Sequence, residues 1–242
     1  MTVLFHASDL HFGAEDSAAL AWFAQEVEQH RPDAVIITGD LTMRARSAEF
    51  AAAQEWLAAL GRPVLIEPGN HDLPYFNPVR RIWRPYGRVM RLQQELHDGV
   101  TLDHVHLVSL RTTARVQLRL NWSKGRVSGR ALHEALHALL SDPDAQLRIV
   151  LTHHPLIEAN TQSSGRTTGG RAALEAIAAA GADAVLSGHV HDPFDLKVPT
   201  AAGPVRLIGA GTLSERVRAT RPSFNRLEIS GGLLDARVCA MA

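Results

Sequence analysis

The sequence has 242 residues, enough to bury the core of one large α/β domain or of two small ones. Hydrophobic residues make up 45% and charged residues 21% of the chain, and the formal net charge is +0, so no charge excess points to nucleic acid or to an anionic membrane. The only cysteine, Cys239, excludes an internal disulfide and a CxxC metal site, whereas 13 histidines give a first hint of a functional site.

Short apolar runs alternate with helical patterns in the first part of the chain. Val3–His6 is expected to form a buried strand, and Ser17–His30 a helix with Leu20, Phe23 and Val27 on one face. The next expected elements are a strand in DAVIITGD (33–40), a helix over Ser47–Leu60 and a strand over Pro63–Glu67. From Leu73 to Arg91, Pro74, Pro78 and Pro85 exclude one continuous helix.

The second part continues the alternation and ends in a series of strands. We expect a strand over Val105–Leu110, a helix over Gly129–Leu140 that Ser128 or Gly129 caps, a strand in RIVLTHHP (148–155), a helix over Arg171–Ala180 and a strand in ADAVLSGH (182–189). The β-rich runs FDLKVPT, VRLIGAG, FNRLEIS and LLDARVC follow. Alternating strands and helices predict α/β layering, with a second sheet or a sheet edge from the tail. No repeat or linker interrupts the chain, and we expect a single domain over residues 1–242.

Polar residues close five of the expected strands. The clusters are ASDLH with Asp9 and His11, TGD with Asp40, PGNHD with Asn70, His71 and Asp72, LTHHP with His153 and His154, and SGHVH with His189 and His191. Because ligands of open α/β sheets bind at the carboxyl ends of strands, all five are expected on one rim. Each cluster alone is more often a turn or a cap, but five in series favour one shared site. Their donors suit Mn, Fe, Zn or Co better than Ca or Mg.

The ordered clusters resemble the signature of the calcineurin-like metallophosphoesterase superfamily, which is D-x-H, G-D, G-N-H-D/E, H-x-P and G-H-x-H. The corresponding residues here are Asp9-Leu10-His11, Gly39-Asp40, Gly69-Asn70-His71-Asp72, His153-His154-Pro155 and Gly188-His189-Val190-His191. The stretches GDLTMRARSAEF, PGNHDLPYFNPVRRIWRPY and GTLSERVRATRPSFNRLEI also look like a bacterial branch that includes cyclic-nucleotide phosphodiesterases.

The resemblance implies a metallophosphoesterase-type αββα sandwich of two mixed β-sheets flanked by helices. It also implies a site for two divalent or trivalent transition-metal ions, most readily Mn, Fe or Zn. Asp9, His11 and His191 would hold one ion, Asn70, His153 and His189 would hold the other, and Asp40 would bridge them. His154 would either support the ligands from outside or be a packed histidine.

Two ions about 3.5–4 Å apart can share a hydroxide, and this metal-bridging hydroxide would attack a phosphate in line. His71 follows the implied ligand Asn70 but does not belong to the ligand set. Histidine is the usual acid near neutral pH, so we expect His71 to protonate the leaving group. Asp72 could orient His71 or tie down a loop.

Residues 73–95 form a candidate cap or substrate-binding segment. Five arginines and no acidic residue lie between Leu73 and Gln94, and Arg80, Arg81 and Arg84 are the candidate substrate-binding residues. A solvated basic loop is an equal alternative, because arginine–phosphate contacts need a specific geometry. Trp83, Tyr86 and Trp122 could stack a nucleobase, although isolated aromatic residues more often belong to the core.

These inferences favour a dinuclear-metal phosphodiesterase of a small phosphodiester, with 3′,5′-cyclic nucleotides as first candidates. The alternatives are a pyrophosphate hydrolase of a nucleotide-linked lipid precursor, a phosphomonoesterase and, less favoured because His71 and the ligand positions are kept, a non-catalytic scaffold. Zero net charge argues against a nuclease or another stable nucleic-acid partner. The sequence shows no signal-peptide pattern, and no apolar run approaches the roughly 18 residues that a membrane span needs. We therefore expect a cytoplasmic protein without a membrane span. The sequence does not decide between a monomer and a homo-oligomer.

Overall fold

In the computed structural model, which describes residues 1–96, 100–114 and 123–242, two five-stranded β-sheets lie one over the other. The first sheet has the order β10-β9-β1-β2-β3. Its parallel strands are β1 (Thr2–Ala7), β2 (Ala34–Ile37) and β3 (Val64–Ile66). The strands β9 (Ser223–Ser230) and β10 (Leu233–Ala240) are each antiparallel to their neighbour, so the sheet is mixed.

The second sheet has the order β4-β5-β6-β8-β7 and is also mixed. The parallel strands are β4 (Val105–Ser109), β5 (Leu147–Leu151), β6 (Ala184–Ser187) and β8 (Val205–Gly209). At one edge, β7 (Phe194–Val198) pairs antiparallel with β8. The β-rich tail was expected to supply a second sheet or a sheet edge, and it does part of each: β7 and β8 complete the second sheet, while β9 and β10 form an edge of the first.

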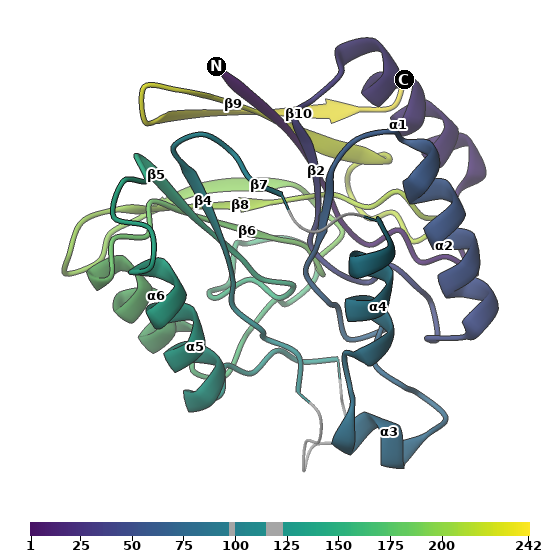
Figure 1. Ribbon diagram of the computed structural model, residues 1–242, viewed down its shortest axis with the longest axis horizontal. Coiled ribbons are helices and arrows are strands. Elements are labelled where there is room, and N and C mark those ends of the chain that lie inside the picture. Colours follow the sequence, from purple (N-terminus) through teal and green to yellow (C-terminus); the bar gives the residue numbers. More distant parts are fainter. Residues whose placement is uncertain (97–99, 115–122) are drawn as a thin grey trace.

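Helices cover the outer face of each sheet, as Figure 1 shows. The helices α1 (Ser17–His30), α2 (Ser47–Ala59) and α4 (Gly87–Leu96) pack on the first sheet. On the second sheet lie α5 (Gly129–Leu139) and α6 (Gly170–Ala179). The short α3 (Pro78–Trp83) extends below α4 in this view. The αββα sandwich inferred from the sequence is confirmed. Among the described residues, no helix has the length and apolar character needed to cross a membrane.

Side-chain caps fix the start of two of the helices, α1 and α5. The Asp16 side chain accepts hydrogen bonds from the backbone N–H groups of Ala18 and Ala19, which fixes the start of α1. The Ser128 side chain accepts from the N–H of Ala131 at the start of α5, so the predicted serine cap is confirmed. These caps satisfy donors that the helix itself leaves free.

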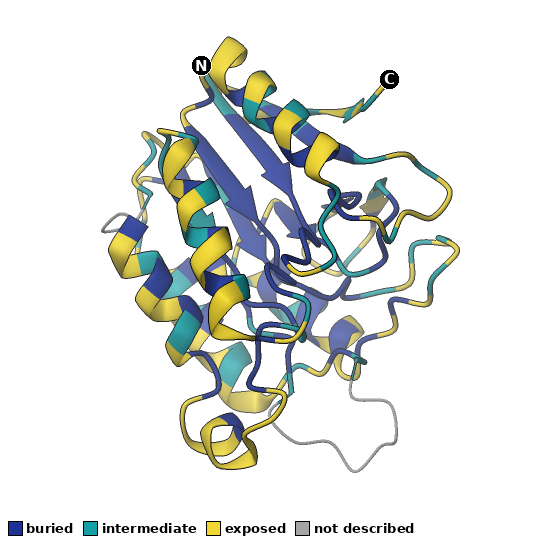
Figure 2. Ribbon diagram, turned by 90° about the vertical axis from the view of Figure 1, so that its right-hand side faces the viewer, coloured by how far each residue is buried: buried dark blue, intermediate teal, exposed yellow. Residues whose placement is uncertain are grey.

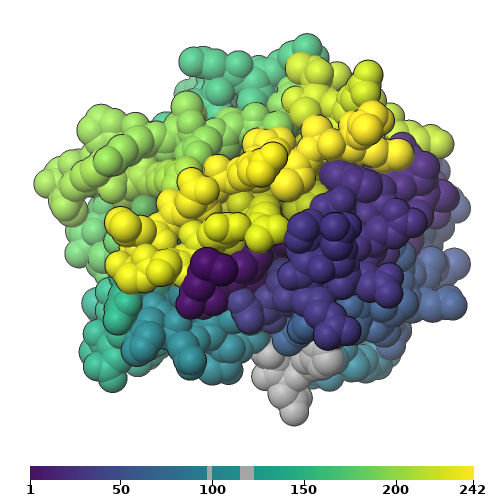
Figure 3. All heavy atoms as spheres, turned by 90° about the horizontal axis from the view of Figure 1, so that it is seen from above, coloured from purple at the N-terminus to yellow at the C-terminus, as the bar shows by residue number. Residues whose placement is uncertain are grey.

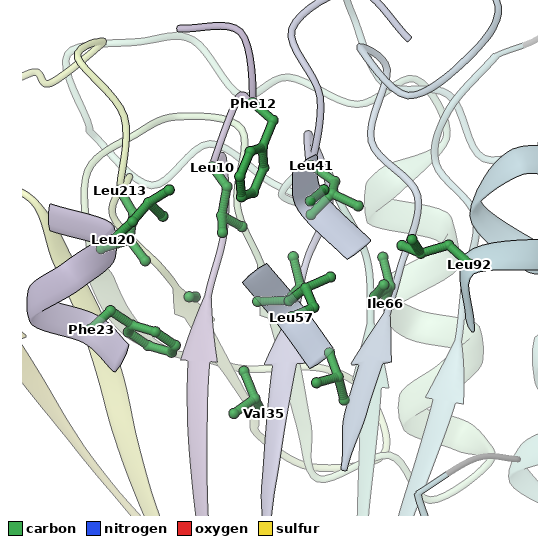
Figure 4. Packing of buried hydrophobic residues seen from close by; sticks show 14 of the residues in the cluster. Leu10, Phe12, Leu20, Phe23, Val35, Leu41, Leu57, Ile66, Leu92 and Leu213 are labelled. Atoms are coloured by element: carbon green, nitrogen blue, oxygen red, sulfur yellow. The ribbon is translucent and has the colours of Figure 1, made fainter. Parts of the chain in front are cut away.

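Three apolar layers hold the sandwich together, and Figure 2 shows the central strands buried while the helices expose one face. The middle layer joins the inner faces of the two sheets through side chains such as Leu4, Ile36, Ile149 and Leu186. The first outer layer packs Phe23 of α1 and Leu57 of α2 against the first sheet (Figure 4). Seen from above, the yellow C-terminal strands lie beside the purple N-terminal residues (Figure 3), as expected from the pairing of β9 with β1.

The proline-containing segment forms two separate helices, α3 and α4, where the sequence predicted only that one continuous helix is excluded. The Asn77 side chain caps α3 by accepting from the N–H of Arg80, and Pro85 lies between the two helices. Tyr86 is buried, and its hydroxyl bonds to Thr113, in agreement with the core interpretation. Trp83 is 80% exposed and belongs to no core, whereas Trp122 lies outside the described residues.

Candidate metal centre

The carboxyl ends of five parallel strands meet at one end of the sandwich and bring the predicted clusters together. Strands β1, β2 and β3 of the first sheet lead to the loops that carry Asp9, Asp40 and Asn70. Strands β5 and β6 of the second sheet lead to His153 and His189. Backbone hydrogen bonds from Asp9 to Gly39 and from Gly188 to His153 join the loops within each sheet. The centre is thus built by both sheets.

Buried apolar residues alternate with the candidate ligands in these loops and so fix the direction in which the ligand side chains point. Leu10 lies between Asp9 and His11, Leu41 follows Asp40, and both leucines are fully buried in the first apolar layer (Figure 4). Val190, between His189 and His191, is likewise buried. Because each apolar side chain turns into the protein, its neighbours are held on the side that faces the other loops.

The backbone of these loops is strained. Of the nine described non-glycine residues with positive φ, five are candidate ligands: Asp9 at 55°, His11 at 50°, Asp40 at 50°, His189 at 70° and His191 at 60°. Such conformations cost of order 1–3 kcal/mol each and persist only where the surrounding structure enforces them. Their concentration at one point is a physical sign of a functional site.

Two glycines let the loops approach one another. A Cβ at Gly69 would meet the backbone nitrogen and Oδ1 of Asp40, and a Cβ at Gly188 would meet the side chains of Ser8 and Asp9. Neither position has room for a side chain. The glycines that precede Asn70 and His189 in their motifs are therefore required by close packing.

One group of donors surrounds the Asp9 carboxylate. Nε2 of His191 lies 3.1 Å and Nε2 of His11 lies 3.7 Å from Asp9 Oδ1, and the two imidazole nitrogens are 3.3 Å apart. The backbone N–H of His189 donates to Asp9 Oδ2. Asp9, His11 and His191 thus converge as one potential set of metal ligands.

A second group surrounds His153, whose Nε2 lies 3.1 Å from Oδ1 of Asn70. The ring of His189 packs against that of His153 with centroids 5.1 Å apart. Asp40 lies between the two groups, because its Oδ2 is 3.4 Å from Nε2 of His153 and 3.9 Å from Nε2 of His11. The structure therefore brings together all seven residues that the sequence indicated as ligands.

The chemistry of this donor set fits a bound cation. Asp9 and Asp40 are fully buried or nearly so, and Asp9 Oδ1 has no aligned hydrogen-bond donor among the described residues. A buried carboxylate is costly unless aligned hydrogen bonds or a nearby positive charge compensate it. Carboxylate, amide and imidazole donors together match transition-metal coordination.

The pKa values show that the centre attracts positive charge. Burial alone would raise the pKa values of Asp9 and Asp40, but the neighbouring histidines, chiefly His191 for Asp9 and His153 for Asp40, hold both well below the usual range. Burial lowers the pKa of His153, but the Asp40 charge outweighs it and raises the pKa to about 10. A metal cation at this point would replace such protons.

Two candidate ligands, His11 and His189, have pKa values shifted in the opposite direction, whereas that of His191 is raised as for His153, because Asp9 outweighs the effect of burial. Burial lowers the pKa of His11 to about 4 and that of His189 to about 3, against the attraction of Asp40 and Asp9. Both rings are therefore neutral near pH 7, which is the form of histidine that binds a metal. No rearrangement of protons on these two side chains has to precede metal binding.

His71 lies at the edge of the cluster, with its side chain 20% exposed. Its Nδ1 lies 2.7 Å from the Met43 backbone oxygen, and its Nε2 lies 4.0 Å from Asp40 Oδ2. Its ring meets that of His11 edge-on at a centroid distance of 4.9 Å. One ring nitrogen is thus held by the backbone, and the other faces the centre.

Asp72 turns away from the centre and ties loops together. Its two oxygens accept from the backbone N–H groups of Leu41, Thr42 and Gly69 and from the Thr42 hydroxyl. Burial and then repulsion from Asp40 raise its pKa to about 6. Of the two roles considered for Asp72, these contacts support the tying of a loop; the His71 ring is oriented by Met43.

His154 is a buried, packed histidine that also touches the candidate ligands. Nδ1 lies 2.9 Å from the Thr112 hydroxyl and Nε2 lies 2.9 Å from the Ser123 backbone oxygen. The His154 ring packs on those of His153 and His189 at centroid distances of 4.6 and 4.3 Å. Because both ring nitrogens are engaged, His154 supports the centre and is not available as a ligand.

The candidate substrate-binding arginines lie on or next to α3. Arg81 is buried and donates to the Pro74 backbone oxygen, while Arg80 and Arg84 are exposed. Among the described residues, no hydrogen bond joins the side chain of Arg80 or Arg84 to the metal-ligand cluster. Their role in substrate binding stays a prediction.

Arg216 is the residue that the sequence interpretation missed. It lies in the loop after β8, and its guanidinium Nη1 is 3.3 Å from Nε2 of His11. Its backbone oxygen accepts from Nδ1 of His191. Its position after a strand of the second sheet, like that of the other polar clusters, is the one sequence feature that could have indicated a role at the site. Within SERVRATR, however, nothing distinguishes Arg216 from its neighbouring arginines.

Comparisons with known proteins bear on the family and the fold of the chain. The family model described as calcineurin-like phosphoesterase matches residues 2–193. Glycerophosphodiester phosphodiesterase GpdQ of Enterobacter lignolyticus is 34% identical over 93 residues, which span 32% of this chain and only 34% of that protein. A Synechococcus sp. protein named "Probable cyclic nucleotide phosphodiesterase" is 26% identical over 199 residues, or 77% of this chain and 72% of that one. A dimetal phosphatase structure from Danio rerio has a TM-score of 0.67 at 14% identity, covering 100% of this chain and 99% of that chain, which shows a shared fold.

Proposed function

The chain belongs to the calcineurin-like phosphoesterase family, and on that premise we propose that it is a phosphodiesterase that works with two transition-metal ions. The observation that carries this proposal is the position of Asp40, whose carboxylate lies between the donor groups around Asp9 and His153. A carboxylate can give one oxygen to each of two cations, which makes this position suited to a bridging ligand.

In this proposal Asp9, His11 and His191 hold one ion, and Asn70, His153 and His189 hold the other. Mn, Fe or Zn are the metals that best match the mixture of imidazole, amide and carboxylate donors. When bound, two such ions polarise phosphate oxygens and supply an oxygen nucleophile near neutral pH. Their identity is part of the proposal.

The surrounding residues supply proton transfer and rigidity. His71 presents Nε2 toward the centre because Nδ1 is fixed by the Met43 oxygen, and from this position it delivers a proton to the leaving oxygen. Asp72 keeps the loops of Asp40 and Asn70 in register through its four accepted hydrogen bonds. His154 supports His153 and His189 from behind.

The substrate that we propose is a small phosphodiester, with 3′,5′-cyclic nucleotides first and glycerophosphodiesters second. Both relatives reported above carry phosphodiesterase in their names, which supports diester chemistry over monoester chemistry. A phosphomonoesterase and a pyrophosphate hydrolase are the alternatives. We propose further that residues 1–242 act as a single catalytic domain, in which the segment 73–95 serves as a cap or substrate-binding segment.

A substrate panel tests this function. Mn-loaded protein is assayed on cyclic nucleotides, glycerophosphodiesters, bis(p-nitrophenyl) phosphate and p-nitrophenyl phosphate. We expect a larger kcat/KM for bis(p-nitrophenyl) phosphate than for the monoester, and turnover of at least one natural diester. A tenfold or greater preference for the monoester would refute the proposed diesterase. The variant Asp40→Asn, which removes the charge of the central carboxylate, serves as the inactive control.

A further inference from the structure

The guanidinium of Arg216 points into the metal centre from a loop that contributes no ligand of its own. We propose that Arg216 binds the non-bridging oxygens of the phosphate on which the enzyme acts. This inference rests on the proposed function, because it assigns a recognition residue to the same site. Arg216 is not among the substrate-binding candidates that the sequence offered, which are Arg80, Arg81 and Arg84.

The loop that carries Arg216 is held in place at several points. The Thr212 hydroxyl donates to the Asp9 backbone oxygen, and Ser214 pairs with Glu15 across an isolated β-bridge. Beyond Arg216, the Asp192 carboxylate accepts from the N–H groups of Ala219 and Thr220. The loop is therefore joined both to the segment after Asp9 and to the segment after His191, and Arg216 is fixed between them.

Within the centre, the guanidinium contacts only weak or replaceable acceptors. Nη1 lies 3.3 Å from Nε2 of His11 and 4.0 Å from the Met43 sulfur. Among the described residues, no acidic side chain forms an ion pair with Arg216. A guanidinium is always charged and can only donate, so a half-buried one without a carboxylate partner has unused capacity to bind an anion.

Because Arg216 contacts His11, its capacity to bind an anion depends on whether a metal ion is bound to His11. The nitrogen that accepts from Arg216 is the one that lies closest to Asp9 and Asp40, where a metal ligand is proposed. Once a cation takes that lone pair, the guanidinium loses its acceptor and needs another. A phosphate drawn to the same cation presents oxygens for which the planar fork of arginine is well suited.

The placement also agrees with the role of His71. Both residues lie on the side of Met43, because Nδ1 of His71 contacts its backbone oxygen and Arg216 contacts its sulfur. His11 lies next to both of them. On this side, His71 would face the leaving oxygen while Arg216 neutralises charge on the equatorial oxygens, where it accumulates in phosphoryl transfer.

Binding of inorganic phosphate to Mn-loaded protein tests the proposal without relying on turnover. We expect Arg216→Gln to weaken phosphate binding in titration calorimetry by about 10–100-fold, the range for loss of a charge-assisted bidentate contact. Manganese binding should be unchanged or tighter, because the variant removes a competitor for His11 and keeps the backbone oxygen that holds His191. The exposed neighbour Arg218, changed to Gln, is the matched control and should bind phosphate as the wild type does.

Kinetics on bis(p-nitrophenyl) phosphate give an independent readout. Arg216→Ala should lower kcat/KM by about 10²–10³-fold, as for loss of one transition-state donor, and added guanidinium chloride should restore part of the rate. Wild-type phosphate affinity in Arg216→Gln, or loss of manganese from it, would overturn the inference. If the wild type cleaves diesters while Arg216→Gln still binds phosphate normally, only the role of Arg216 fails; if the wild type prefers monoesters, only the diesterase assignment fails.

Discussion

The Nδ1 atom of His71 lies 2.7 Å from the backbone oxygen of Met43. Because a carbonyl oxygen only accepts, Nδ1 carries the hydrogen, and Nε2 is left for exchange of a proton at the centre. This one contact fixes both the orientation and the tautomer of the ring, and it assigns to the backbone a task that a carboxylate often performs at such sites.

Replacement of His71 tests its role in proton transfer. His71→Ala should keep the bound metal and lose rate by about 10²–10⁴-fold on diesters with alkoxide leaving groups, but far less on p-nitrophenolate, which leaves without a proton. Metal content by elemental analysis and the slope of log kcat against leaving-group pKa are the two measurements. A variant that loses metal, or that loses the same factor on every substrate, does not agree with this role.

Asp72 should act on stability. Asp72→Ala leaves buried backbone donors of Leu41, Thr42 and Gly69 without their acceptor, and each such loss costs about 1–3 kcal/mol. We expect the free energy of unfolding in urea to fall by about 3–5 kcal/mol. The exposed Asp144, changed to Ala, is the control and should shift it by less than about 0.5 kcal/mol. An equally small shift in Asp72→Ala would contradict the loop-tying role.

Glu67 makes stability depend on pH. Burial is the main cause that raises its pKa from 4.5 to about 7, while the Ser109 hydroxyl and Arg111 oppose the shift. Between these values the folded state keeps a proton that the unfolded state has lost, so the free energy of unfolding falls as the pH rises from about 4.5 to about 7.

Glu67→Gln imitates the protonated carboxyl group and should remove this dependence. Its stability relative to the wild type should increase by about 2–3 kcal/mol between pH 5 and pH 8, as the size of the pKa shift implies. The measurement is urea unfolding at both pH values in the presence of a chelator, with the exposed Glu95→Gln as control. If the free energies of unfolding of variant and wild type differ by the same amount at both pH values, Glu67 does not titrate in this range.

Gly69 should tolerate no side chain. The Cβ of alanine would meet the backbone nitrogen and Oδ1 of Asp40, so the Asp40 loop would have to move. Gly69→Ala is expected to lose about 1–3 kcal/mol of stability and to bind metal more weakly. Gly129→Ala, where a Cβ meets no atom within 4 Å, is the matched control and should leave both properties unchanged. Normal metal binding by Gly69→Ala would contradict the packing argument.

The sequence predicted the elements, and it selected the candidate ligands that the structure brings together, where local signals determine them. Helix α1 has the predicted bounds because an aspartate caps it and three apolar residues recur on one face. The candidate ligands follow strands whose parallel pairing brings their ends together, so short motifs sufficed.

The features that the sequence did not predict depend on contacts between distant segments. Helices α3 and α4 are short and separated by proline, so their periodicity is too brief to detect. Arg216 meets His11 across 205 positions, and only the folded loop distinguishes it from Arg218. The sequence alone could not decide whether Asp72 orients His71 or ties down a loop. The backbone N–H groups that donate to it, those of Leu41 and Thr42, lie on the loop after another strand.

The central claim is that Asp40 joins two metal ions in one site. The most direct measurement is anomalous diffraction from crystals grown with manganese. We predict two peaks on either side of the Asp40 carboxylate, one near Asp9, His11 and His191 and the other near Asn70, His153 and His189, about 3.5–4 Å apart. A single peak, or two peaks of which neither contacts Asp40, would contradict the dinuclear site.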